Sequence, residues 1–183
     1  MPRAAASLIR PAASTVPFYL RLFHAIEQSA FSVWMRESPS ALAFPNILFL
    51  HTLGMAFLAG INAAVAFRVL GFAPRMRLSP MEQFFPLMWA AFWLSVVTGL
   101  MLLWAYPTKA FTNPVWYAKF AFIGLAVATT RMIKKRMFGD PAIDERPLPA
   151  AGRLLAGASL FFWAGAITSG KLLAHTYVRL FSY

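Results

Sequence analysis

The sequence contains no cysteine and very few acidic residues. Without thiols the chain has no disulfide, thiolate metal site, iron–sulfur cluster or covalently attached c-type haem. Only 13% of its residues are charged, whereas an ordinary soluble domain has about 25%. Because 60% of the residues are hydrophobic, the chain also lacks the polar surface needed to face water on all sides. These shortages exclude an ordinary soluble domain and predict an integral membrane protein.

Four apolar segments are long enough to cross a bilayer, which takes roughly 20 residues for a helix. The predicted spans cover about 46–70, 84–106, 114–133 and 152–178. Gly71 follows the first span, Pro107 ends the second and Pro114 begins the third, in positions typical of helix ends. We therefore predict an all-α fold, with an integral membrane four-helix bundle over residues 45–183.

Positive charge gathers in the first and third connections between these spans. Those connections carry Arg75, Arg77, Lys134, Lys135, Arg136 and Arg146. The second connection, 107–113, has only Lys109. The positive-inside rule then places both termini on the outer, periplasmic side of a bacterial inner membrane. The same basic positions suit anionic lipid headgroups, and no basic face of a soluble fold indicates a nucleic-acid partner.

A different kind of helix precedes the first span. Within 17–44, apolar residues recur at helical spacing from Tyr19 to Trp34. The opposite stripe consists of Arg21, His24, Gln28 and Ser32. This pattern predicts one interfacial amphipathic helix, about 17–36, lying on the outer membrane surface with His24 in solvent. Residues 1–16 are expected to form a flexible N-terminal segment.

Amphipathic aromatic side chains concentrate near the predicted outer boundary. They are Trp34, Trp104, Trp116, Tyr19, Tyr106, Tyr117, Tyr177 and Tyr183. Such rings form ordinary belts at membrane interfaces. They are also typical anchors of protein interfaces. The outer layer is therefore either a belt or a docking surface for an outer-face protein partner or a second copy of the chain.

Two histidines are expected at one depth in the outer half of the bundle. His51 follows the start of the first span by about five residues, and His175 precedes the end of the last one by a similar distance. Imidazoles facing each other from two helices suit the axial ligation of b-type haem. Gly54 and Ala164 would let a flat macrocycle approach the helices. Two alternatives stay open, namely a copper site that adds Met55 and simple helix packing without any metal.

Several other polar groups in the spans need partners. Lys171 lies about two turns inside the outer boundary and is expected to bind a propionate, quinone oxygen, lipid phosphate or carboxylate. Arg179 could pair with a propionate in the same way. Lys119 is expected to extend toward the outer surface. Asn62 is expected to bond a neighbouring helix, and Thr98 its own backbone.

Short motifs are similar to a family of bacterial membrane proteins defined only by a domain of unknown function. The chain has W-M-R-E-S after Val33, F-P-N-I-L-F-L-H-T-L-G from Phe44, N-P at Asn113 and S-G-K-L from Ser169. The resemblance covers about 32–172 and implies a four-helix fold in which His51 and Lys171 are the residues of interest. A looser similarity links the chain to copper-resistance D-type membrane proteins and four-helix b-type cytochromes.

These features favour an electron-transfer subunit over a complete enzyme. No carboxylate lies within a predicted span, no Ser–His–Asp arrangement occurs, and we assign no catalytic residue. The leading hypothesis is a subunit that binds b-type haem, quinone or both, and carries electrons between an outer-face redox partner and the quinone pool. The alternative is a cofactor-free membrane anchor or scaffold for a periplasmic enzyme or oligomeric complex. A small transporter is disfavoured because the spans show no inverted repeat.

Overall fold

The computed structural model describes residues 17–40, 42–140, 143–145 and 147–180, with backbone only for 174 and 177–180. The expected flexible segment 1–16 lies outside these residues. In the described part of the chain all regular structure is helical, which confirms the all-α class. The elements are α1 (Phe18–Glu27), α2 (Ala30–Glu37), α3 (Phe44–Leu70), the 3-10 helix η1 (Ser79–Phe84), α4 (Phe85–Ala105), α5 (Pro107–Phe111), α6 (Pro114–Met137) and α7 (Ala150–Leu180).

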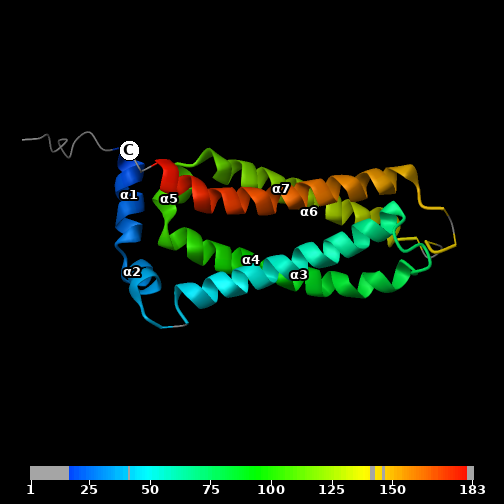
Figure 1. The fold of residues 1–183 in the computed structure, drawn as a ribbon, viewed down its shortest axis with the longest axis horizontal. Helices are drawn as coiled ribbons and strands as arrows, with labels where there is room; N and C mark the ends of the chain where they lie inside the picture. The colour runs from blue at the N-terminus through cyan, green and yellow to red at the C-terminus, as the bar shows by residue number, and fades with distance from the viewer. Residues whose placement is uncertain (1–16, 41, 141–142, 146, 181–183) are drawn as a thin grey trace, which may run out of the picture.

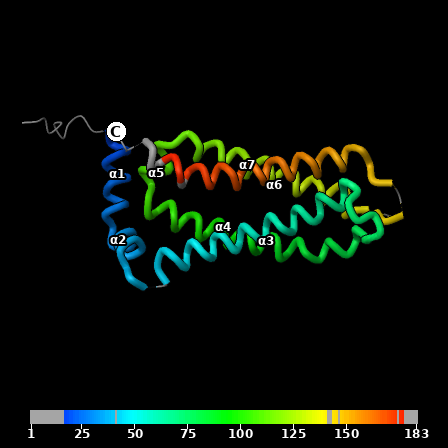
Figure 2. Tube along the Cα trace, in the orientation of Figure 1, coloured from blue at the N-terminus to red at the C-terminus, as the bar shows by residue number. Residues whose placement is uncertain are grey.

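Four long helices lie side by side and form the body of the molecule (Figure 1). Close contacts join α6 to α7, α7 to α3 and α3 to α4, whereas α4 and α6 approach each other at few positions. The hairpins α3–α4 and α6–α7 diverge toward the end that carries α1 and α2 (Figure 2). We call this the α1 end. The opposite end, with the α3–η1 and α6–α7 connections, is the basic end.

The long helices are apolar on their outer faces as well as inside. In the described residues, three helices are long and apolar enough to cross a membrane, namely Phe44–Leu70, Ser79–Ala105 and Ala150–Leu173. Only 22% of the most apolar stretch of Ser79–Ala105 is buried inside the protein. Trp93 and Phe161 are 61% and 64% exposed. Apolar surface on this scale fits a lipid bilayer as the surroundings.

The fourth expected span, α6, does not meet the same criterion. Its last two turns carry Arg131, Lys134, Lys135 and Arg136, and Lys119 lies near its start. The helix is nevertheless as long as its neighbours and packs along α7. The structure therefore shows a helical body with three apolar spans and one more cationic helix.

The segment before α3 forms two helices, so the prediction of a single interfacial helix was wrong. Ser29 separates them: its backbone is extended (ψ 150°), and its hydroxyl oxygen accepts from the Ser32 N–H at 3.4 Å. Ser32 does not lie on a solvated stripe. It is fully buried, and its hydroxyl donates to the Trp104 carbonyl at 3.0 Å. Arg36 donates to the Ala105 carbonyl at 2.9 Å. The last carbonyls of a helix lack internal partners, so α2 caps the C-terminus of α4.

The other half of this segment docks on α5. The Glu27 carboxylate accepts from the Thr108 N–H at 3.1 Å. The rings of Phe23 and Phe111 stack with centroids 4.9 Å apart. Together α1 and α2 lie across the α1 end of the helices (Figure 1).

At the basic end, one carboxylate links the two connections. The α3 helix ends at Gly71, whose φ of 104° lies in the left-handed region that glycine adopts without strain. Farther along, Asp144 accepts from the backbone N–H groups of Leu78 at 2.6 Å and Ser79 at 3.2 Å. The α6–α7 connection thereby anchors the start of η1.

A substitution at Gly54 should test the close approach of α3 to α4. A Cβ there would lie 2.5 Å from the Ser95 Oγ and 2.9 Å from the Ala91 carbonyl oxygen. Because a backbone atom would have to move, Gly54→Ala should lower the free energy of unfolding by about 1–3 kcal/mol. Gly60→Ala is the matched control, since nothing lies within 4 Å of its added Cβ. Equal stability of the two variants in detergent unfolding would contradict this packing.

The Asp144 anchor should make stability depend on acid pH. Hydrogen bonds from the Ser79 side chain and from the Leu78 and Ser79 backbone hold the pKa of Asp144 below its usual value. Its stabilising contribution is therefore complete above the unfolded value of about 3.9 and is lost as the pH falls through the folded value. Melting temperatures should fall less steeply below about pH 4 in Asp144→Asn than in the wild type or in Glu145→Gln. Identical pH profiles for all three proteins would refute the anchor.

Candidate functional site

His51 lies near the start of α3, with its ring against α4. Its Nδ1 is 3.0 Å from the Ser95 carbonyl oxygen and 3.1 Å from the Thr98 Oγ1. A carbonyl oxygen only accepts, and the Thr98 hydroxyl already donates to the Leu94 carbonyl at 2.7 Å. In the neutral ring the proton is therefore on Nδ1, which leaves a lone pair on Nε2. Histidines that bind ligands through Nε2 are commonly held in this way.

Lys119 on α6 is a second polar group in the same region. A Cβ placed on Gly170 of α7 would lie 3.8 Å from its Cε and 3.9 Å from its Nζ. Its side chain is partly buried, and it lies near the start of α6, at the same end of the molecule as His51 near the start of α3. Among the described residues it has no hydrogen-bond or ion-pair partner. An ammonium group has three donors and no acceptor, so this one needs an acceptor from a ligand or solvent.

Two glycines define the space around His51. The face of α3 at Gly54 is filled by α4, as its contacts with Ser95 and Ala91 show. It does not leave room for a macrocycle, so the expected role of Gly54 beside a haem was wrong. A Cβ at Gly99 would lie 3.1 Å from the His51 Cε1. Gly99 therefore makes room for the imidazole ring.

The expected second histidine lies elsewhere. His175 is exposed on α7, and its Nδ1 is 3.0 Å from the Lys171 carbonyl of its own helix. The start of α3 and the end of α7 lie on opposite sides of the α1 end (Figures 1 and 2). The described contacts do not bring His51 and His175 together. The described residues also contain no group of three or more His, Asp or Glu that could hold a metal ion.

The remaining predicted site residues are scattered. Met55 is partly buried and packs on the core between α4, α6 and α7. Lys171 and Ala164 are exposed. The side chain of Arg179 lies outside the described residues. His24 is exposed on α1, as expected.

A buried polar cluster joins three helices, as predicted for Asn62. The Asn62 Oδ1 on α3 accepts from the Thr130 hydroxyl on α6 at 3.1 Å and from the Ser159 hydroxyl on α7 at 3.0 Å. The Trp163 indole N–H donates to the Thr130 Oγ1 at 3.3 Å. The Asn62 Nδ2 is buried without a partner. The sequence predicts a polar contact for Asn62, but nothing in the sequence distinguishes its partners, Thr130 and Ser159, from other Ser and Thr residues of the helices.

The aromatic side chains at the α1 end are largely exposed. Tyr19, Trp104 and Tyr117 are 54%, 51% and 56% exposed, and Trp34 is 45% exposed. Trp116 instead packs inward, with its ring centroid 4.7 Å from that of Phe111. Tyr177 and Tyr183 lie outside the described side chains. The layer fits a membrane belt and a docking surface equally well.

The sequence predicts that Lys119 extends toward the outer surface. The structure shows in addition that its side chain packs beside Gly170 of α7. Lys119 and Gly170 are far apart in the sequence, so the sequence alone does not reveal that they lie side by side. A three-residue spacing on α6 places Phe122 and Lys119 on adjoining faces, and Phe122 packs into the space that a Cβ at Gly165 would fill. This match of large and small residues on α6 and α7 is the one sequence signal for the α6 face that turns inward.

No protein-family model matches the chain, and comparisons with curated proteins and with solved structures give no match either. The resemblance to a bacterial membrane family therefore stays a prediction. What the site can do must be argued from its own residues.

The tautomer of His51 gives a direct test of the site geometry. In the neutral ring, ¹⁵N NMR of labelled protein in a bilayer should show a protonated Nδ1 and an unprotonated Nε2. His51→Gln assigns the signal. Thr98→Val should leave the tautomer unchanged, because the Ser95 carbonyl remains as acceptor. A protonated Nε2 with a bare Nδ1 would show that the ring does not donate to Ser95.

Proposed function

We propose that the chain is a membrane subunit that binds a quinone headgroup beside His51 and Lys119, and passes electrons between an outer-face redox partner and the quinone pool. One observation carries the proposal. An imidazole with a free Nε2 on α3 and an ammonium without a partner on α6 lie at the same end of an otherwise apolar helical body, near the starts of their helices.

A quinone matches the chemistry of these two groups. Its two carbonyl oxygens accept hydrogen bonds, and the Lys119 ammonium offers donors to one of them. The neutral His51 ring can accept through Nε2 from a hydroxyl of the reduced quinol and, once protonated, can donate to a carbonyl of the oxidised quinone. Quinones are dissolved in the bilayer, so a ligand of this class reaches a site among membrane helices directly. The quinone supplies the redox chemistry, while the chain orients it and provides the charge nearby.

The bis-histidine haem does not fit the residues as they are placed. Gly54 is closed by α4, and His175 bonds its own helix on an exposed face. We therefore assign no step to a haem held by this pair. His51 remains the residue on which any haem of this chain would depend.

The orientation follows from the charges. We propose that α6 forms a fourth span, with the basic end in the cytoplasm and the α1 end outside. Four basic residues in the last two turns of α6 then lie within the inner interface, where long basic side chains reach the headgroups: Arg131, Lys134, Lys135 and Arg136. Both termini are thereby placed on the periplasmic side of a bacterial inner membrane.

Quinone titration of the purified protein in detergent tests the proposal. Short-chain ubiquinone should quench tryptophan fluorescence with a saturable dissociation constant. Lys119→Met should raise that constant about tenfold or more, because it removes a charged donor to a quinone carbonyl, and His51→Ala should do the same for the quinol, because it removes the Nε2 that accepts from a quinol hydroxyl. His175→Ala is the matched control and should change little, because its ring lies on another face.

A reduced-minus-oxidised absorption spectrum separates quinone from haem. Saturable quinone binding without a Soret band supports the proposal. A Soret band that disappears in His51→Ala would assign haem in place of quinone. Unchanged quinone affinity in both His51→Ala and Lys119→Met would remove the site altogether.

A cofactor-free anchor is the second candidate, favoured by the exposed apolar side chains of α1 and α2. Phe18, Phe31 and Trp34 are 76%, 42% and 45% exposed on the segment that lies across the α1 end. An anchor would bind neither quinone nor haem and would associate through this segment. Sedimentation in detergent would then show an oligomer that Trp34→Ser weakens.

A further inference from the structure

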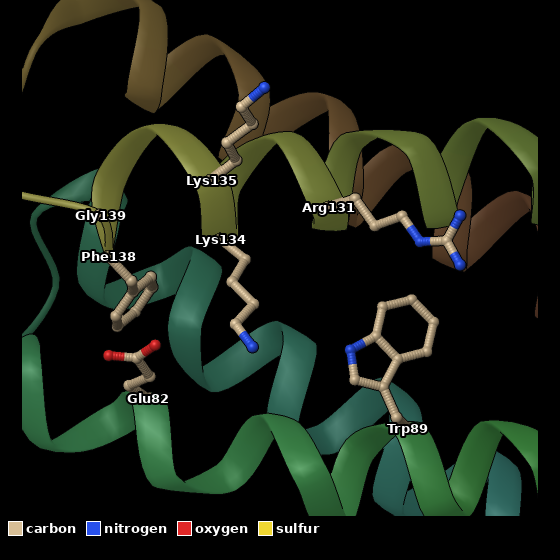
Figure 3. Close-up of a pocket in the computed structure, with 7 residues that line it drawn as sticks. All are labelled: Glu82, Trp89, Arg131, Lys134, Lys135, Phe138 and Gly139. Atoms are coloured by element: carbon tan, nitrogen blue, oxygen red, sulfur yellow. The ribbon is translucent and has the colours of Figure 1, made fainter.

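A groove lies between α4 and α6 at the basic end, far from His51. Its volume is about 610 Å³. It is lined by Glu82, Trp89, Arg131, Lys134, Lys135, Phe138 and Gly139. Figure 3 shows Arg131 and Lys134 extending from α6 toward α4, with Trp89 rising from α4 below Arg131. Lys135 points away from α4 in the same view. We call this the basic groove.

The two cations that extend into the basic groove have no acidic partner. Among the described residues the one ion pair within 4.0 Å joins Arg77 and Asp144, in the neighbouring connections. The Arg131 Cζ instead lies 5.2 Å from the centre of the Trp89 ring, and the Lys134 Nζ lies 5.4 Å from that of Phe85. Aromatic faces orient cations without neutralising them. The groove therefore presents two positive charges that no described carboxylate within 4.0 Å neutralises, with Glu82 as the one acidic residue among its lining.

The walls of the groove become apolar toward the middle of the helices. On α6, Val127 and Ile123 precede Arg131 by one and two turns on the same face, and both are partly buried against the core. On α4, the Phe92 ring packs edge-on against Trp89 with centroids 5.6 Å apart. The backbones of α4 and α6 come close at few positions, and their partly buried apolar side chains form one continuous apolar surface along the seam. Cationic side chains at the groove, continued by an apolar surface along the seam, match the charged headgroup and the apolar tail of a lipid.

We propose that the basic groove binds an anionic glycerophospholipid, with its phosphate between Arg131 and Lys134 and an acyl chain along the α4–α6 seam. The Arg131 guanidinium can bond two phosphate oxygens at once, and Lys134 adds a point charge. Both lie in the last two turns of α6, the level at which basic residues meet headgroups. Glu82 at the groove disfavours a second anionic group and accepts from a hydroxyl of the headgroup.

Lipid binding is measured best by native mass spectrometry of the full-length protein released from detergent micelles. Phosphatidylglycerol should bind at least about tenfold more tightly than phosphatidylcholine, since the quaternary ammonium of the latter is repelled by the groove. The double variant Arg131→Gln/Lys134→Gln should abolish this preference. Arg136→Gln/Arg153→Gln removes the same charge outside the basic groove and should keep the preference within about twofold.

Each outcome decides the proposal. Equal losses in the two double variants would show a diffuse charge effect and overturn the site, as would equal binding of the two lipids by the wild type. Displacement of the lipid by millimolar glycerol 3-phosphate or inorganic phosphate would assign a free phosphate in its place. If the double variant does not fold, the single variants Arg131→Gln and Lys134→Gln should each lose about threefold or more in affinity. Quinone titration is independent of all these variants, so failure here leaves the His51 site untouched.

Discussion

The buried joint at Asn62 determines how the four long helices are arranged. In lipid, apolar contact gives helices little preference for each other, so hydrogen bonds and small residues decide the packing. The Asn62 Oδ1 accepts from Thr130 on α6 and Ser159 on α7, and so ties one hairpin to the other. This joint holds α3 against α7 and leaves α4 apart from α6. The joint includes no residue of α4, and the two hairpins diverge toward the α1 end (Figure 2).

A second constraint closes the α1 end. A helix that stops inside an apolar region leaves carbonyl groups that water cannot reach. At the end of α4 the Ser32 hydroxyl and the Arg36 guanidinium supply these donors. The guanidinium also donates to the Glu27 carbonyl at 2.7 Å, which holds the end of α1 beside α2. The segment is therefore part of the folded body, and its exposed apolar face is what remains for a membrane or partner.

Hydropathy predicted the long helices because span length and helix-end residues are local properties. The predicted ends at Gly71, Pro107 and Pro114 agree with the structure within about two residues. What could not be predicted depends on rotation about a helix axis. Ser32 looked polar and solvated, yet it turns inward because α4 needs a donor. Equal depth of His51 and His175 does not fix the directions of their side chains, and the packing of Gly54 on α4 turns His51 toward that helix.

The two proposed sites share one feature: each contains cationic side chains that no described carboxylate neutralises. The chain has six acidic side chains, and among the described helices long and apolar enough to span a membrane only Ser79–Ala105 contains one, Glu82 in its first turn. Glu27 and Asp144 are already engaged by backbone N–H groups. The helix carbonyls are engaged within their own helices, so Lys119 and Arg131 find no acceptor in the body of the protein. In the two proposals their acceptors are molecules that the bilayer supplies, a carbonyl compound among the helices and a phosphate at the interface.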